Sequence, residues 1–397
     1  MTVTAPKGFR AAGLAAGIKQ SGGKDFALVV NDSPAATSAA AAVFTTNRFA
    51  AAPVLVSREA VAAAQGGWAV PRAVVLNSGG ANACTGPDGY DEAQQTAAAL
   101  ARRLCLKTEE VLVCSTGLIG ERLPVGKILA GMHLAVIALG ATDQAGRDAA
   151  EAIMTTDTRP KTAVARPEGG AYAIGGMAKG AGMLAPELAT MLVVITTDAL
   201  IDQATAQQAL DQACGASFQR IDSDGCMSTN DTVILLASGA SQHQPDNQDF
   251  TSQLTSLAQD LAGQLIADAE GARHEIAVKV TGALTEAGAL AVARAIVRSN
   301  LFKTAIAGDD PNWGRILSAV GTVPADAAPF DPARVGVEIN GVAVCRDGQA
   351  GEPREKVDLA PRRVDVVVDL AAGPAEATIW TNDLTREYVS INADYSS

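Results

Sequence analysis

Short runs of apolar, often β-branched residues alternate along the chain with longer segments of helical periodicity. The short runs predict strands, because β-branched side chains pack well on a covered, pleated surface; they lie at residues 26–30, 53–56, 73–76, 111–114, 191–197, 232–236, 275–281 and 364–370. Apolar positions three and four apart predict helices over residues 91–104, 203–214, 252–269 and 284–299. Both halves of the chain mix the two kinds of element, so the pattern predicts an α/β protein.

Length and composition extend this prediction to domain organisation. A chain of 397 residues is long for one core, so we expect two domains or one large domain with two halves. With 48% hydrophobic but only 4% aromatic residues, the interior is built from Ala, Val, Leu and Ile. The loop before Thr190 is the expected division, which gives residues 1–189 and 190–397.

Charge and cysteine usage exclude several classes of protein. A formal net charge of −12 argues against a nucleic-acid partner, because phosphates would be repelled. The six cysteines form no C-x-x-C pair and the three histidines are scattered, so we expect buried, reduced thiols and no metal site. No run of 18 apolar residues occurs and the N-terminus is a poor signal peptide. We therefore expect a soluble cytoplasmic protein without a membrane partner.

The segment from Lys179 to Ile195 joins an irregular loop to a strand. Gly180 and Gly182 permit unusual backbone angles and Pro186 blocks a helix, so Thr190 stands at the strand's start. The simpler interpretation is a β-branched residue opening a strand. The alternative is a nucleophile that attacks its own upstream carbonyl and breaks the Ala189–Thr190 bond. The new α-amino group, with a pKa of about 7.7 to 8.0, would then serve as its general base.

Other segments admit both a structural and a chemical interpretation. Near matches to nucleotide-binding motifs at Gly180 and Gly120 lack the required flanking residues, so they are set aside. The run 111–114 continues to Thr116 and Gly117, which is typical of a strand followed by a turn, or of an oxyanion hole for acyl transfer. Lys179 is a surface charge or the fixed cation that an acidic protein needs for a carboxylate substrate. The carboxylate of Glu270 is a solvated helix end or a partner for a substrate ammonium group, and Thr155 is by default a turn hydroxyl.

Read together, many of these segments resemble the ornithine acetyltransferase family, also called glutamate N-acetyltransferase. The resemblance spans nearly the whole chain in matching order. The segments are GFRAAG at 8–13, AGIK at 16–19, FTTN at 44–47, NSG at 77–79, ANACTG at 81–86, STG at 115–117, TTDT at 155–158, KGAGM at 179–183, ATM at 189–191, DGCMSTND at 224–231, DPNWGR at 310–315 and YVSINADY at 388–395.

The resemblance implies an enzyme of arginine biosynthesis with an α/β/β/α sandwich fold. Members cleave themselves between an Ala and a Thr, which corresponds to Ala189–Thr190 and gives an α chain (1–189) and a β chain (190–397) in an α2β2 heterotetramer. Thr190 would be the nucleophile, with Thr116 and Gly117 as the oxyanion hole. The implied substrate contacts are Thr155, Lys179, Thr190, Glu270, Asn392 and Ser397.

The implied reaction is a ping-pong transfer of acetyl from N-acetylornithine to glutamate through acetyl-Thr190, with no metal or cofactor. Whether acetyl-CoA also serves as a donor is left open by these residues. Two alternatives remain: an N-terminal-nucleophile amidohydrolase or aminopeptidase of similar architecture, and a noncatalytic amino-acid-binding protein. Three departures from the family pattern, Gly80, Leu188 and Ser397, replace Asn, Met and Thr without removing a catalytic group.

Overall fold

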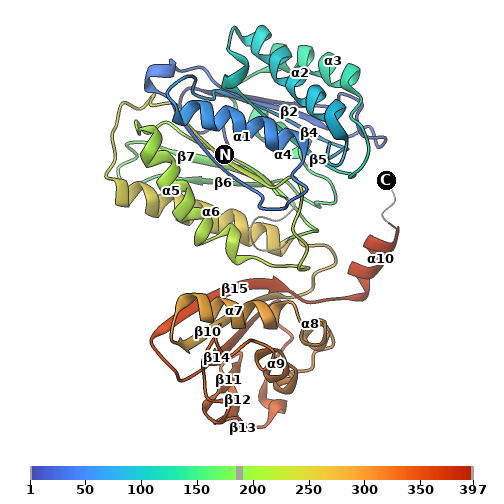
Figure 1. The fold of residues 1–397 in the computed structure, drawn as a ribbon, viewed down its shortest axis with the longest axis vertical. Coiled ribbons are helices and arrows are strands. Elements are labelled where there is room, and N and C mark those ends of the chain that lie inside the picture. The colour runs from blue at the N-terminus through green and yellow to red at the C-terminus, as the bar shows by residue number, and fades with distance from the viewer. Residues whose placement is uncertain (1, 185–190, 395–397) are drawn as a thin grey trace. The chain divides into compact units, whose positions relative to one another are not determined.

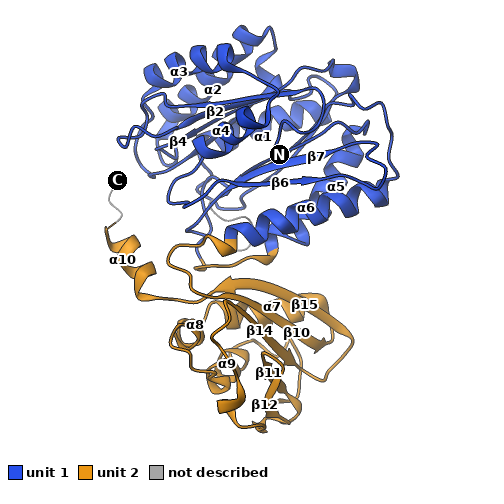
Figure 2. Cartoon of the chain, turned by 180° about the vertical axis from the view of Figure 1, so that it is seen from behind, with its two compact units in different colours: residues 1–219, 226–265 blue, residues 220–225, 266–397 orange. Residues whose placement is uncertain are grey.

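The computed structural model describes residues 2–184 and 191–394, which form two compact units (Figure 2). Unit 1 comprises residues 1–219 and 226–265, and unit 2 comprises residues 220–225 and 266–397. The predicted mixture of helices and strands is confirmed in both units. The predicted division between residues 189 and 190 is a cleavage of the chain, not a boundary between compact units, and it stays a prediction.

One four-stranded sheet of unit 1, here called sheet A, has the order β1-β2-β4-β5. Its strands are Phe9–Leu14, Phe26–Asn31, Ala73–Ser78 and Val111–Thr116. The pairs β1/β2 and β2/β4 are antiparallel, and β4/β5 is parallel. Helices α2 (Gly86–Leu104) and α3 (Val125–Ala138) pack on one face of this sheet through alanine and aliphatic side chains.

The second sheet of unit 1, sheet B, has the order β3-β9-β8-β7-β6. Its strands are Ala39–Phe44, Thr232–Ala237, Leu192–Thr197, Ile174–Lys179 and Lys161–Ala165. Strand β8 runs parallel to β9 and antiparallel to β7. Helices α5 (Gln203–Gly215) and α6 (Asn247–Ala267) lie along the outer side of sheet B (Figure 1).

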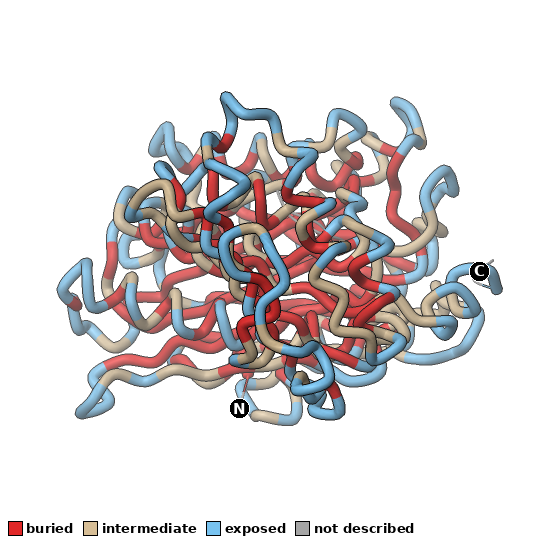
Figure 3. The backbone as a smooth tube through the Cα atoms, turned by 90° about the horizontal axis from the view of Figure 1, so that it is seen from below, coloured by how far each residue is buried: buried red, intermediate tan, exposed pale blue. Residues whose placement is uncertain are grey.

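The facing surfaces of the two sheets share one core. Helices α1 (Ala52–Gln65) and α4 (Asp143–Ala152) contribute to it, together with inward side chains from both sheets. The helix–sheet–sheet–helix order agrees with the expected sandwich, with α1 and α4 packed into the core that the sheets share. Buried backbone follows the strands, and exposed backbone follows loops and outer helix faces (Figure 3).

Unit 2 is built on a six-stranded sheet with the order β13-β12-β11-β14-β10-β15. The strands are Gln349–Ala350, Val342–Arg346, Gly336–Ile339, Arg363–Asp369, Glu275–Ala283 and Ala375–Asn382. Buried residues alternate along β14, so one face of the sheet forms the core. The helices are α7 (Glu286–Val297), α8 (Asn300–Ala307), α9 (Trp313–Val320) and α10 (Arg386–Asp394).

The strand predicted at residues 53–56 is wrong, because this run lies inside α1. Helix α1 starts at Ala52 with Pro53 in its first turn, where the fixed φ of proline suits a helix and its missing N–H costs nothing. A four-residue apolar run cannot be distinguished by periodicity from a buried helical segment. The Ala-rich continuation to Gln65 decides for helix. Among the described residues, no helix is long and apolar enough to cross a membrane.

The fold predicts a sharp division among the thiols. Cys84 and Cys105 are exposed, whereas Cys114 and Cys214 are buried; burial raises the pKa of the Cys114 thiol to about 12 and also raises that of Cys214. Iodoacetamide should therefore label Cys84 and Cys105 in the native protein at least ~100-fold faster than the buried pair. Peptide mass spectrometry measures this, with guanidinium-unfolded protein as the control in which all four react. Equal native rates would contradict the described packing.

Candidate active site

Two residues implied by the resemblance meet where sheets A and B approach each other. Thr116 is the last residue of β5 in sheet A, and Lys179 is the last residue of β7 in sheet B. Both are 1% exposed. The Lys179 Nζ donates a hydrogen bond to Thr116 Oγ1 at 3.2 Å. A cation from one sheet thus contacts a hydroxyl from the other in the interior of unit 1.

The backbone around Gly117 has room for glycine only. Its φ is +135°, a region that favours glycine, and an added Cβ would lie 2.5 Å from the Gly80 nitrogen. The amides of Gly79 and Gly80 donate to the Thr116 carbonyl at 2.9 and 3.0 Å. The turn that follows β5 is therefore fixed by backbone contacts, so the expected turn and the candidate oxyanion segment are the same structure.

A single carboxylate, that of Asp157, organises the surrounding loops. Its Oδ1 accepts from Lys161 Nζ at 2.6 Å and from the Gly180 amide at 2.7 Å, and its Oδ2 accepts from the Thr155 amide at 3.0 Å. The Asp157 and Lys161 side chains are fully buried. Thr155 and the residue after Lys179, which lie far apart in sequence, are thereby held by the same group.

Electrostatics keep this carboxylate ionised. Burial acts to raise the pKa of Asp157, but Lys179 and Lys161 outweigh it, together with the hydrogen bonds from Lys161 and Gly180, so the pKa falls to about 2. Burial lowers the pKa of Lys179, and the nearby Lys161 and Lys19 lower it further, while Asp157 opposes them. Cations thus gather locally in a protein of net charge −12.

The expected nucleophile and cleavage position, Ala189 and Thr190, lie outside the described residues, as does Ser397. The strand expected after Thr190 is confirmed: β8 begins at Leu192, and Met191 before it is fully buried. Lys179 pairs with Leu192 across the β7/β8 ladder. The chain therefore re-enters sheet B directly beside the Lys179–Thr116 contact.

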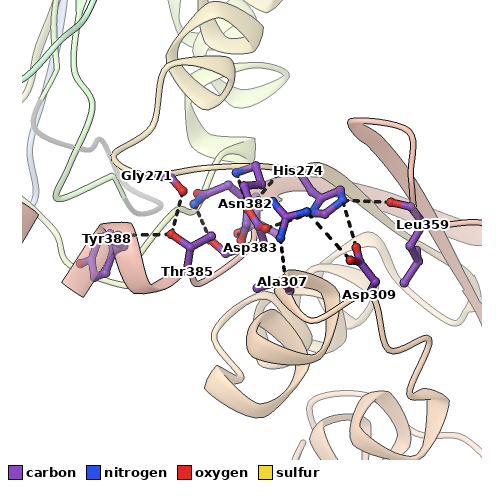
Figure 4. Close-up of polar contacts among 11 residues, drawn as sticks. Gly271, His274, Ala307, Asp309, Leu359, Asn382, Asp383, Thr385 and Tyr388 are labelled. Atoms are coloured by element: carbon purple, nitrogen blue, oxygen red, sulfur yellow. Dashed lines mark hydrogen bonds and ion pairs between the residues drawn. The ribbon is translucent and has the colours of Figure 1, made fainter. Parts of the chain in front are cut away.

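Two further implied residues meet in unit 2. Asn392 Nδ2 donates to Glu270 Oε2 at 2.8 Å, so the side chain that the resemblance assigns to a substrate ammonium group is held by its neighbour. The Thr385 hydroxyl donates to the Gly271 carbonyl at 2.7 Å, and the Tyr388 amide donates to that hydroxyl at 3.2 Å (Figure 4). The start of α10 is thus tied to the residue that follows Glu270.

A buried His–Asp pair secures this region further. His274 is 3% exposed; its Nδ1 lies 2.9 Å from Asp383 Oδ2, and its Nε2 lies 3.0 Å from the Leu359 carbonyl oxygen (Figure 4). Asp383 Oδ1 also accepts the His274 amide at 2.9 Å. The pair joins the start of β10 to the end of β15, the two segments that lead to Glu270 and Asn392.

Sequence reasoning missed Asp157, Lys161, His274 and Asp383 as site-forming residues. Asp157 and Lys161 stand four residues apart, a charge spacing that could have drawn attention to them. No comparable signal marks His274 and Asp383, which are 109 residues apart. Among the described residues, no group of three or more His, Cys, Asp or Glu side chains is placed to hold a metal ion.

A mixed α/β fold that gathers buried ionisable groups with shifted pKa values at strand ends defines the class as an enzyme. A model of the ArgJ family matches residues 10–397. The arginine biosynthesis bifunctional protein ArgJ of Bifidobacterium longum is 55% identical over 399 residues, and that of Thermobifida fusca is 56% identical over 397, each match covering 100% of both chains. A crystal structure of ornithine acetyltransferase complexed with ornithine, from Mycobacterium tuberculosis, is 48% identical with a TM-score of 0.44, covering 48% of this chain and 96% of that one.

The chain belongs to the ArgJ family. The match extends over nearly its whole length, as the resemblance of the ordered motifs predicts.

The Asp157–Lys161 pair should dominate the stability of unit 1. Asp157→Asn removes the carboxylate that lies 2.6 Å from the buried Lys161 ammonium, and we expect a loss of about 3 to 5 kcal/mol in the free energy of unfolding at pH 7. The lowered pKa of Asp157 contributes roughly 2 kcal/mol above pH ~4, which is lost as the pH falls toward 2. Urea unfolding at pH 7 and pH 3 measures both effects.

Glu352→Gln is the matched control for this prediction. Glu352 and Lys356 form an ion pair with the same four-residue spacing, but their side chains are 39% and 60% exposed. An exposed pair of this kind contributes little to stability, because water and salt screen the two charges. Equal losses in the two variants would show that burial of the Asp157 pair has no energetic consequence.

Proposed function

We propose that the chain transfers the acetyl group from N-acetylornithine to glutamate in arginine biosynthesis. The observation that carries the proposal is the buried contact of Lys179 with Thr116 beside the chain's re-entry at Met191. It supplies a hydroxyl, a fixed cation and a glycine turn at one place, as acyl transfer to and from amino-acid substrates requires. The full-length similarity to ArgJ proteins supports the same reaction.

In the first half-reaction, Thr190 Oγ attacks the acetyl carbonyl carbon of N-acetylornithine. Its proton passes to the α-amino group that self-cleavage at Ala189–Thr190 has freed, and this group then delivers the proton to the departing ornithine nitrogen. Thr116 and Gly117 stabilise the negative charge on the carbonyl oxygen in the tetrahedral intermediate. The products are ornithine and an acetyl ester of Thr190.

In the second half-reaction, the amino group of glutamate attacks that ester. The glutamate nitrogen loses a proton, Thr190 Oγ regains one, and acetylglutamate leaves. Lys179 and Thr155 are proposed to hold the substrate carboxylate, and Glu270, Asn392 and Ser397 are the further substrate contacts that the family resemblance implies. Burial lowers the pKa of Lys179, and an arriving carboxylate would act in the opposite direction by stabilising the ammonium form.

No metal or dissociable cofactor enters this proposal. The similar proteins of Bifidobacterium longum and Thermobifida fusca are bifunctional, which favours acetyl-CoA as a second acetyl donor to glutamate. We further propose that self-cleavage yields two α and two β chains in a heterotetramer, which works in the cytoplasm.

Self-cleavage is tested by denaturing electrophoresis of the wild type and of Thr190→Ala. We expect fragments 1–189 and 190–397 from the wild type, and one uncleaved, inactive chain from the variant, because alanine has no nucleophilic oxygen. Thr190→Ser is the control: it keeps a hydroxyl and should retain cleavage. A wild-type protein that remains one chain while transferring acetyl groups would refute the mechanism.

Acyl transfer is tested by incubating the self-cleaved enzyme with N-acetylornithine and then measuring the mass of its 190–397 chain under denaturing conditions. An acetyl adduct on Thr190 is expected, and adding glutamate should discharge it to acetylglutamate. An amidohydrolase would release acetate without forming acetylglutamate, and a binding protein would form no adduct. Incubation with acetyl-CoA and glutamate alone tests the second donor.

A further inference from the structure

Residues 228–231 have no role in the reaction proposed for this chain. Their backbone is hydrogen-bonded to the segment that connects β3 and α1. The Thr45 amide donates to the Asp231 carbonyl and the Ala51 amide to the Thr229 carbonyl, both at 2.9 Å. The Thr45 hydroxyl donates to the Ser228 carbonyl at 2.7 Å. The side chains of this segment therefore project from a backbone that is fixed at several points, immediately before β9 begins at Thr232.

Asn230 connects this segment to the oxyanion strand. Its Nδ2 donates to the carbonyls of Ala81 and Ser115 at 2.6 and 2.8 Å, and its Oδ1 accepts from the Thr229 hydroxyl at 2.6 Å. The side chain is buried. Because both amide hydrogens face carbonyl oxygens, only an amide placed this way satisfies both acceptors. Ser115 immediately precedes Thr116.

Asp231 connects the same segment to the start of β8. Its Oδ1 accepts from the Met191 amide at 3.0 Å, one peptide bond after residue 190. The residue is fully buried, and Oδ2 has no hydrogen-bond partner among the described residues. Burial raises the pKa of Asp231 well above its usual value, although the Met191 amide and Lys179 act against it.

We propose that Asn230 and Asp231 are positioning residues that set the spacing between the oxyanion segment at Ser115–Thr116 and the start of β8 at Met191. Adjacent residues on one braced segment reach the two parts of the site: Asn230 acts through the Ser115 carbonyl, and Asp231 acts through the Met191 amide. This inference rests on the proposed function, because it assigns the two parts their roles in acyl transfer.

The physical reason is the short range over which a reacting atom must be placed. A misplacement of about 1 Å can lower a rate ~100-fold, and the two parts belong to different sheets with no backbone pairing between β5 and β8. Loss of the Asn230 and Asp231 contacts would therefore lower turnover more than it weakens substrate binding. The proposed binding residues Lys179 and Thr155 are held separately, because Asp157 accepts the amides of Gly180 and Thr155.

The test compares Asp231→Ala, Asp231→Asn and Asn230→Ala with the full-length wild type, measuring self-cleavage, melting temperature, kcat and KM for acetyl transfer from N-acetylornithine. Both alanine variants should lose ~100-fold in kcat with KM changed less than ~3-fold. Asp231→Asn should stay within ~5-fold of wild-type kcat, because its side-chain oxygen still accepts from the Met191 amide.

Asp198→Ala is the matched control. Asp198 is buried just beyond the opposite end of β8, where its carboxylate accepts the Ala173 and Lys7 amides at 2.7 and 3.0 Å. It should lower the melting temperature at least as much as Asp231→Ala yet keep wild-type kcat. A drop in kcat that follows melting temperature across all four variants would overturn the inference.

The inference and the proposed function fail differently. A wild type that neither cleaves nor transfers acetyl groups refutes the proposed function. An active wild type whose Asp231→Ala and Asn230→Ala variants keep wild-type kcat refutes the inference alone. A variant that melts cooperatively at the wild-type temperature but no longer cleaves supports the inference, because its fold is then intact while the reaction is lost.

Discussion

The buried charge of Asp157 is the constraint on which the candidate site depends. A carboxylate in the interior is tolerated only when charges and donors surround it, and here Lys161 and the amides of Thr155 and Gly180 do so. Thr155 and Lys161 flank Asp157 in one short segment, whereas Gly180 follows the end of β7. Satisfying one carboxylate therefore folds its own segment and ties it to the end of β7, and the cost of leaving it unsatisfied keeps both in place.

The same constraint explains how an acidic protein presents cations to a small substrate. Lys161 forms an ion pair with Asp157. Lys179, at the end of a strand of one sheet, donates instead to Thr116 in the other sheet. Local positive charge is thus created by burial and pairing rather than by overall composition. In unit 2, the His274–Asp383 pair has the comparable task of tying together the segments that carry Glu270 and Asn392.

Sequence patterns predicted the apolar β-branched strands well, as at residues 111–114 and 232–236. They missed strands such as β3, AAAAVF, and β7, IGGMAK, because Ala and Gly have little strand preference and pairing with neighbours decides their conformation. Family resemblance supplied Thr116, Gly117, Thr155 and Lys179, four residues that the fold places in one unit. It could not supply the partners that hold them, since Asn230 and Ser115 meet only through tertiary packing.

Two buried carboxyl groups act on Lys179, and their pKa values are pushed in opposite directions. Asp157 lies beside two lysines and accepts backbone amides, so its pKa falls, whereas burial of Asp231 outweighs the Met191 amide, Lys179 and Ser228, so its pKa rises. The charge of Asp157 therefore stabilises the buried ammonium groups of Lys179 and Lys161, whereas Asp231 holds the start of β8 through the Met191 amide. Opposed environments for chemically identical groups are how a site assigns separate tasks to them, here charge for Asp157 and alignment for Asp231.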